Sequence, residues 1–310
     1  MQIVNLKKPG KPFELQSCGL CLGNFDGVHR GHRALVEELK RQNAAREQHL
    51  YLGALLFAQP PSSILSPITV PQLTTLDEKL KLLGDMGLHF AVLYDFAELK
   101  DMSPDDFVKQ VLIKQCHCRL AVCGFNYTYG AKGAGNVARL QETFGAAPGC
   151  TLSVVDAVTD GPHTVSSSLI RSMLENGHPE DAARLLGRPY SLQGKVTHGR
   201  HVGTTMGFPT ANLAFPSGSL IPMKGVYLSC VRIARHSYFA ISNVGRRPTF
   251  ENDGQINCET FIFHYNGDLY GREIQVSFLR FLREEKKFNS VAELEAQIKH
   301  DIEQANLYIV

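Results

Sequence analysis

Two histidines three residues apart are the first side chains of this chain that could do chemistry. His29 and His32 stand in the segment 23–32, which reads GNFDGVHRGH and leads from an apolar run into a helical pattern. Gly27 and Gly31 let the backbone turn tightly and approach a ligand. A helix that begins near Gly31 points its free N–H groups at the turn, so both imidazoles could donate hydrogen bonds to a phosphate there. A surface loop that contains histidines, or a zinc pair, is the alternative.

Two later segments of the first half suit the same chemistry. Residues 165–171 read VSSSLIR, and their three serines suit a helix N-terminus that binds phosphate, with Arg171 as a cation one turn along. A plain N-cap would explain the serines equally well. Residues 124–133 form a glycine-rich aromatic loop, which either stacks a planar ring or is a turn.

The second half of the chain has its own candidate phosphate-binding segment. Residues 194–212 carry glycines and small polar side chains whose spacing lets backbone N–H groups surround phosphates. Thr210 and Asn212 lie two apart on an extended segment, so they point the same way and could jointly bind Mg²⁺ and a phosphate oxygen. A glycine-rich hairpin stiffened by proline is the alternative.

The elements that must position these residues follow from the apolar pattern. In the first half, short apolar runs alternate with helical patterns, which predicts a parallel sheet covered on both faces. The expected strands are 19–25, 50–57, 89–94, 120–124 and 151–155, and the expected helices are 32–47, 76–86, 104–116 and 137–144. Ligands of such sheets bind beyond the carboxyl ends of the strands, where the histidine segment lies.

After residue 187 the pattern changes to short alternating runs separated by turn residues, which predicts a small antiparallel β-barrel. The expected strands are 191–196, 225–233, 238–242, 258–263 and 273–282. One helix closes the chain, and Ser290 with Glu293 forms a capping box at its start. The predicted fold is therefore a Rossmann-like α/β domain over 1–186 and a barrel with a closing helix over 187–310.

Composition limits the function classes. The chain has 310 residues and a formal net charge of +2, so it lacks the positive field of a dedicated nucleic-acid binder. No apolar run approaches the ~20 residues of a membrane helix, and we expect no secretory signal. Eight cysteines suit a reduced, cytoplasmic chain. Cys18 and Cys21 face opposite sides of their expected strand, so we expect buried small residues there in place of zinc or redox chemistry.

The histidine turn, the aromatic loop and the SSxxIR helix together resemble the adenylyltransferase half of the bacterial bifunctional riboflavin kinase/FMN adenylyltransferase family. The resemblance implies that His29 and His32 are catalytic and contact ATP phosphates. The implied nucleotide-binding residues of this half are Gly23, Asn24, Phe25, Gly31, Ser166, Ser167 and Arg171, and the implied flavin-binding residues are Asp26, Asn126 and Tyr127. Two segments depart from the family pattern: residues 57–61 read FAQPP, with Pro60 and no histidine, and residues 126–129 read NYTY in place of DFRF.

Several short sequence motifs in the second half resemble the riboflavin kinase module of the same family. Together they span nearly all of 187–305. A primary alcohol must attack the γ-phosphate of ATP, so a carboxylate base is needed, and Glu259 matches the family's catalytic glutamate. The resemblance further implies that Thr210 and Asn212 bind Mg²⁺ and ATP, that Gly199, Arg200 and Gly203 belong to the phosphate loop, and that Arg283 helps close the flavin pocket. Phe261 stands where many members have histidine.

The resemblance implies one enzyme with two activities: riboflavin and ATP give FMN, then FMN and ATP give FAD and pyrophosphate, with Mg²⁺. Its expected partners are the small molecules ATP, riboflavin and FMN, with no nucleic acid or membrane partner, and self-association stays open. Two alternatives remain: a chain that retains only one activity, and a flavin- or nucleotide-binding regulatory protein with inactive sites.

Overall fold

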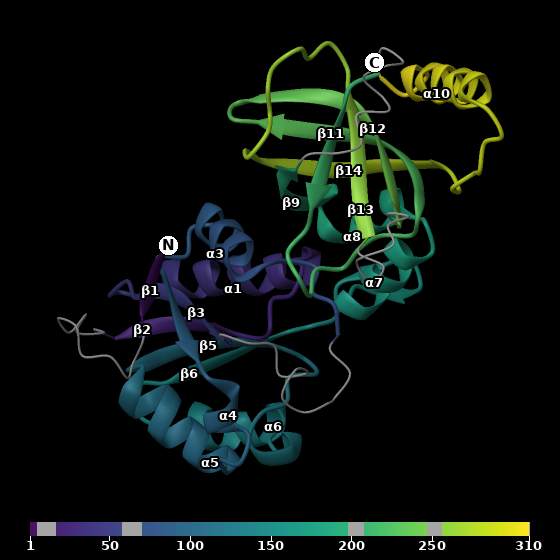
Figure 1. The fold of residues 1–310 in the computed structure, drawn as a ribbon. Coiled ribbons are helices and arrows are strands. Elements are labelled where there is room, and N and C mark those ends of the chain that lie inside the picture. The colour runs from purple at the N-terminus through teal and green to yellow at the C-terminus, as the bar shows by residue number, and fades with distance from the viewer. Residues whose placement is uncertain (5–16, 58–69, 198–207, 247–255, 310) are drawn as a thin grey trace. The chain divides into compact units, whose positions relative to one another are not determined.

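The computed structural model describes residues 1–4, 17–57, 70–197, 208–246 and 256–309 (Figure 1). Contacts divide the chain into two compact units, Met1–Ser167 (unit 1) and Ser168–Val310 (unit 2). The boundary that the sequence suggests, residue 187, lies further along the chain. The helix α8 (Pro179–Leu186) precedes that boundary and packs on barrel strands of unit 2.

Unit 1 is built on a six-stranded parallel sheet, as the alternation of apolar runs and helices predicts. The strand order is β1-β4-β3-β2-β5-β6. The strands are β1 (Gln2–Val4), β2 (Cys18–Leu22), β3 (Tyr51–Phe57), β4 (Phe90–Tyr94), β5 (Cys118–Gly124) and β6 (Thr151–Val155). The edge strand β1 was not predicted, because three residues are too few for a period to be read. β2 and β5 are neighbours, so the segments that follow them leave the sheet at the same edge.

Helices cover both faces of this sheet (Figure 1). One face carries α1 (Arg30–Ala44) and α3 (Leu76–Asp85). The other carries α5 (Pro104–Asp106), which continues into the π-helix η1 (Phe107–Gln115), and α6 (Val137–Leu140), which continues into η3 (Gln141–Gly145). The remaining elements are α4 (Phe96–Leu99), η2 (Ala131–Gly133), β7 (Thr159–Asp160), β8 (His163–Thr164) and α7 (Ser167–Glu175), of which α7 runs into unit 2. Cys18 and Cys21 are fully buried in the two separate apolar clusters on opposite faces, as their spacing predicts.

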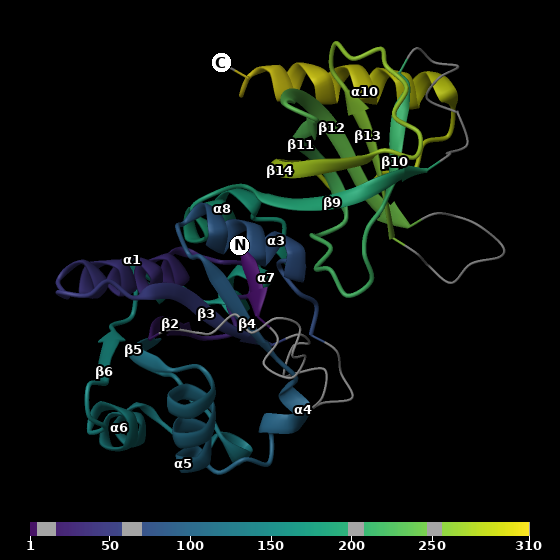
Figure 2. The ribbon, with the colours of Figure 1, turned by 90° about the vertical axis from the view of Figure 1, so that its left-hand side faces the viewer.

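Unit 2 contains a closed barrel of six antiparallel strands in the order β10-β13-β12-β11-β14-β9, and this confirms the predicted architecture. The strands are β9 (Tyr190–Thr197), β10 (Thr210–Ala214), β11 (Gly225–Ile233), β12 (His236–Arg246), β13 (Ile256–Ile262) and β14 (Glu273–Arg283). The closing helix α10 (Val291–Asn306) lies against the outside of the barrel, where it packs with residues of β11, β12 and β14 (Figure 2). Ser290 caps it by accepting from the Glu293 N–H at 3.2 Å, whereas the Glu293 carboxylate accepts from the N–H of Asn289.

The barrel interior contains a ladder of buried hydroxyl groups. The Ser242 hydroxyl lies 2.7 Å from that of Ser229 and 2.9 Å from that of Thr260, so the ladder crosses β11, β12 and β13. All three side chains are fully buried. Since successive strand residues point to opposite faces, Glu259 projects from the outer face of β13. None of the helices in the described ranges combines the length and the apolar character needed to cross a membrane.

Candidate active sites

The two histidines of unit 1 cap the helix α1 through each other. His29 is the N-cap residue, and its Nδ1 accepts from the backbone N–H of His32 at 3.4 Å. The Nδ1 of His32 in turn accepts from the backbone N–H of His29 at 3.3 Å. The two rings stack with their centroids 3.7 Å apart. This is a reciprocal capping box in which imidazoles replace the usual hydroxyl and carboxylate.

The capping bonds assign the protonation of both rings. Because each Nδ1 accepts from a backbone N–H, the neutral imidazole must carry its proton on Nε2. Burial lowers the pKa of His32 well below its ordinary value, and electrostatic interactions with His29 and Lys79 lower it further. His32 is therefore neutral at pH 7, and its Nε2–H can donate to a phosphate without a change of protonation.

The turn that precedes the helix is backbone-strained. Phe25 and Val28 have φ of +54° and +43°, and Gly27 has φ of +81°. The left-handed region is costly for a β-branched residue such as Val28.

Gly31 is needed for the space it leaves, because a Cβ there would lie 3.1 Å from two atoms of the His29 ring. At Gly23 a Cβ would lie 3.2 Å from the Phe25 ring.

Two of the predicted ligand-contacting residues are buried side chains of the turn itself. Phe25 is fully buried, and its ring lies 4.8 Å from that of His32, which it supports. Asp26 is 1% exposed, and its carboxylate accepts from the backbone N–H groups of Leu73 at 2.9 Å and Thr74 at 3.2 Å. The Asp26 carboxylate thus holds the segment that leads into α3.

Asn24 is exposed, and sequence reasoning missed the group that holds its backbone. The buried Lys79 of α3 donates from Nζ to the Asn24 carbonyl at 2.8 Å. The position of Lys79 within its helix was the signal that could have identified it as buried. Lys79 lies three residues after Leu76 and four before Leu83, on the apolar face of its helix.

The serine segment reaches the same turn. The Ser167 hydroxyl donates to the carbonyl oxygen of Asp26 at 2.8 Å, so the start of α7 is tied to the histidine turn. Ser166 lies directly before α7 and is partly buried. Arg171 lies one turn into α7 and belongs to unit 2, so unit 1 by itself brings together the histidines and Ser167 but does not include Arg171.

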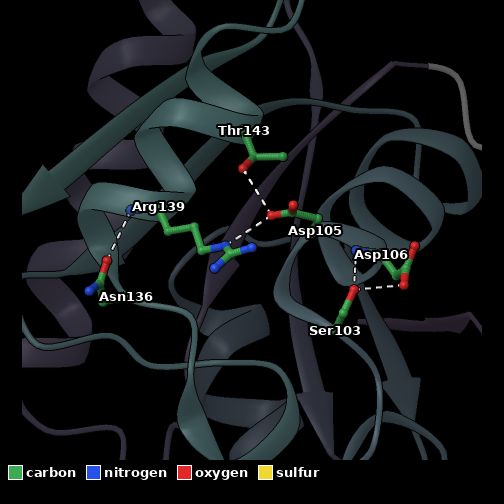
Figure 3. Close-up of polar contacts among 6 residues, drawn as sticks. All are labelled: Ser103, Asp105, Asp106, Asn136, Arg139 and Thr143. Atoms are coloured by element: carbon green, nitrogen blue, oxygen red, sulfur yellow. Dashed lines mark hydrogen bonds and ion pairs between the residues drawn. The ribbon is translucent and has the colours of Figure 1, made fainter.

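The aromatic loop after β5 contacts η1 through Tyr129, whose ring lies 5.3 Å from that of Phe107. Asn126 is exposed, and Tyr127 is partly buried and stacks on Tyr129 with centroids 5.7 Å apart. α5 and α6 are joined by an ion pair, in which the Arg139 guanidinium donates to the Asp105 carboxylate at 3.0 Å, and both side chains point toward each other in Figure 3.

In unit 2, a cavity of about 200 Å³ lies between the outer face of the barrel and α10. Glu259 of β13 and Asn243 of β12 are cross-strand neighbours, and both line it. Within the described ranges the Glu259 carboxylate has no hydrogen bond or ion pair, so it is free to accept a proton from a hydroxyl in the cavity. Phe261, two residues along the same face, adds an apolar wall and packs edge-to-face with Phe208 at 5.3 Å.

The predicted metal-binding pair lies on the neighbouring strand. Asn212 of β10 is the cross-strand neighbour of Glu259, and Thr210 lines the cavity. The amide oxygen of Asn212, which is 4% exposed, accepts one hydrogen bond from Asn257 at 2.9 Å. The predicted loop residues Gly199, Arg200 and Gly203 lie outside the described residues, as does Pro60.

Arg283 lines the cavity and also fixes the helix beside it. Its Nε and Nη2 donate to the two carboxylate oxygens of Asp301 at 2.9 and 2.7 Å, and Gln297 adds a third bond to Asp301 at 2.9 Å. Asp301 is 4% exposed. Sequence reasoning missed it, although an acid directly before Ile302 on the apolar stripe of a helix was a usable signal.

Comparisons with known proteins assign each half of the chain to a family. A riboflavin kinase family model matches residues 186–309, and a FAD synthetase family model matches residues 11–169. The bifunctional riboflavin kinase/FMN adenylyltransferase of Bacillus subtilis (strain 168) is 34% identical over 294 residues, which covers 93% of this chain and 92% of the relative. Its namesake from Escherichia coli (strain K12) is 33% identical over 289 residues, or 92% and 91% of the two chains.

A solved structure is similar over almost the whole length. It is a crystal structure from Streptococcus pneumoniae described as a macrolide-efflux protein, 30% identical to this chain, with a TM-score of 0.87 and coverage of 99% of both chains. Its fold is therefore the fold of this chain.

Proposed function

Since this chain belongs to the family of bifunctional riboflavin kinase/FMN adenylyltransferases, we propose that unit 2 phosphorylates riboflavin to FMN and unit 1 adenylylates FMN to FAD. The observation that carries the proposal is that each unit holds a separate group of side chains suited to one of the two reactions. Unit 1 has the reciprocal histidine cap, and unit 2 has Glu259, which has no partner among the described residues, at the wall of a cavity.

In the kinase step, the primary alcohol of riboflavin attacks the γ-phosphorus of ATP. A bond forms between the alcohol oxygen and that phosphorus, the bond to the β-phosphate oxygen breaks, and ADP leaves. Glu259 takes the alcohol proton, and its exposed position on the cavity wall leaves room for the substrate. Arg283 keeps α10, one wall of the cavity, in place through Asp301.

In the adenylyl transfer, an oxygen of the FMN phosphate attacks the α-phosphorus of ATP and pyrophosphate leaves. His29 and His32 donate from Nε2 to phosphate oxygens whose charge grows during the displacement. The N-terminal N–H groups of α1 and its dipole favour the same negative charge. The Ser167 bond to Asp26 fixes the start of α7 beside these donors.

Magnesium fits the donor set of unit 2. Thr210 and Asn212 offer a hydroxyl and an amide oxygen, which are hard ligands of the type Mg²⁺ prefers, and among the described residues the Asn212 oxygen accepts from Asn257 alone, which leaves it one lone pair. When bound there with ATP, the ion supplies neutralisation of phosphate charge.

We also propose that the enzyme works in the cytoplasm. All eight cysteines are free thiols, and six of them are buried. Such a set suits a reducing compartment, which is also where ATP is available.

The test separates the two activities by chromatography. Purified protein is incubated with Mg²⁺ and ATP, in one tube with riboflavin and in another with FMN, and the flavins are then separated. FAD from both tubes is the expected result. FMN that accumulates in the first tube with no product in the second would reduce the function to a kinase, and FAD in the second tube alone would reduce it to an adenylyltransferase. An absence of turnover in both would favour a binding protein.

A further inference from the structure

A buried lysine lies beneath the histidine turn of unit 1, and the mechanism above gives it no role. Lys79 of α3 is 6% exposed, although lysine is among the residues least often buried without a partner. Its Nζ donates to the carbonyl oxygen of Asn24 at 2.8 Å. Burying an ammonium group is costly, so the position calls for a reason beyond packing.

Lys79 is one of three points at which the start of α3 holds the turn. The second is the Asp26 carboxylate, which accepts from the backbone at Leu73 and Thr74. The third is the Thr74 hydroxyl, which accepts from the N–H of Gly27 at 3.0 Å. We call these three contacts the α3 clamp.

The clamp holds a backbone that would otherwise relax. A left-handed conformation at two non-glycine residues, Phe25 and Val28, persists only where the surroundings enforce it. The turn between Asn24 and His29 decides where the His29 ring stands. It also decides where the Phe25 ring supports His32.

The clamp also sets the charge that surrounds His32. The titratable groups that act electrostatically on this ring are His29 from the turn and Lys79 from α3, and the Asp26 carboxylate acts on Lys79. After burial, electrostatic interactions with His29 and Lys79 lower the pKa of His32 further. A neutral His32 is needed for the capping bond from His29, because a proton on Nδ1 would remove its acceptor.

We propose that Lys79 is a positioning residue for adenylyl transfer, which acts through the Asn24 carbonyl to hold the turn and both imidazoles in their donating geometry. The inference rests on the proposed function of unit 1. Lys79 touches no substrate in this role: its contacts are with the protein beneath the turn.

The experiment compares Lys79→Gln, Lys79→Arg and the control Lys81→Gln in the full-length chain. Lys81 is exposed on the same helix. The rates of FAD formation from FMN, resolved into kcat and KM, are measured across the pH range, and riboflavin phosphorylation in the same preparation reports on unit 2. Circular dichroism confirms that each variant is folded.

We expect Lys79→Gln to lower kcat for FAD formation by roughly tenfold to a hundredfold, the scale of a misplaced catalytic group, with phosphorylation unchanged. Loss of the cation raises the pKa of His32, so the acidic limb of the kcat/KM profile moves to higher pH. Lys79→Arg keeps the charge and restores the position of that limb, and Lys81→Gln matches the wild type.

Four results would overturn the inference. One is a folded Lys79→Gln variant with wild-type kcat and an unmoved acidic limb. The second is an equal loss of both activities in Lys79→Gln. The third is a Lys79→Gln chain that does not fold, together with a Lys79→Arg chain that folds with an unchanged rate and a shifted limb. The fourth is an effect of Lys81→Gln as large as that of Lys79→Gln. Absence of FAD formation in the wild type would instead refute the proposed function of unit 1.

Discussion

Replacing Gly31 by alanine tests whether the ring of His29 must stand where the structure places it. Gly31 is the second residue of α1, and a Cβ at this position would lie 3.1 Å from both Cε1 and Nδ1 of that ring. This is closer than ordinary van der Waals contact, so the imidazole must move by a few tenths of an ångström. Its Nδ1 already lies 3.4 Å from the His32 nitrogen, and a hydrogen bond is lost at about 3.6 Å.

The stability and the activity should respond differently to this change. Loss of the capping bond costs about 1 kcal/mol, while alanine is favoured over glycine in a helix by up to about 1 kcal/mol. The two terms nearly cancel, so the free energy of unfolding should stay within about 1 kcal/mol of the wild type. The rate of FAD formation should fall, because a displaced hydrogen-bond donor of this kind costs on the order of tenfold to a hundredfold in kcat.

The assay is chromatographic measurement of FAD formation from FMN, with denaturant unfolding of the same preparation. Gly84→Ala is the matched control, since Gly84 lies in the helix α3 and the atoms nearest to a Cβ there belong to the N-terminal Met1, at 3.3 Å and beyond, and not to a histidine ring. Riboflavin phosphorylation should be unchanged in both variants. A Gly31→Ala enzyme with wild-type kcat for FAD formation would refute the argument, and so would a loss of activity that merely follows a loss of stability.

Three further predictions concern single residues. Glu259→Gln should lower riboflavin phosphorylation by about 10²–10⁴-fold and leave FAD formation from FMN intact; an unchanged phosphorylation rate would remove Glu259 as the base. The folded-state pKa of His32 is lowered, so its contribution to stability is complete above the ordinary value of 6.5 and is lost as the pH falls toward the folded value. Thermal melts should therefore show a smaller loss of stability between about pH 7.5 and about pH 5.5 for His32→Gln than for the wild type, and equal losses would contradict the assignment. Asp301→Asn should destabilise unit 2 by about 2–3 kcal/mol in denaturant titrations, because it breaks the ion pair between the buried Asp301 and the partly exposed Arg283. A change below about 0.5 kcal/mol would mean that this pair contributes no more to stability than an exposed ion pair does.

The sequence predicted the elements well where the physics is local. Short continuous apolar runs predicted five strands of the parallel sheet, because a strand that is buried on both faces consists of consecutive apolar residues. The expected helix 104–116 was found as α5 and η1, and the closing helix was found at Ser290, where a side chain accepts from a backbone N–H three residues on. The strand expected at 238–242 extends over His236–Arg246, since the polar ends of a barrel strand carry little signal.

The parts of the sites that could not be predicted depend on contacts distant in sequence. Nothing near Asp26 indicates that its carboxylate accepts from backbone groups 47 residues later. Lys79 and Asp301 look like solvent-facing charges until the helices that carry them are docked. The histidine spacing, by contrast, was informative, because residues at the cap and at the third helical position of one helix always lie close together.

The hydroxyl ladder inside the barrel has a consequence for how reliably the kinase site assembles. Side chains of a strand alternate with period two, so a slip of β13 by one residue would turn Thr260 out to solvent and bring the carboxylate of Glu259 into the barrel interior. The slip would leave the Ser242 hydroxyl without the partner it has at 2.9 Å and would bury an ionised group in its place. The out-of-register state therefore carries two penalties at once. Chains with β13 out of register should therefore be rare. The hydroxyl ladder inside the barrel fixes the side of β13 from which Glu259 projects, and this orientation does not depend on a bound ligand.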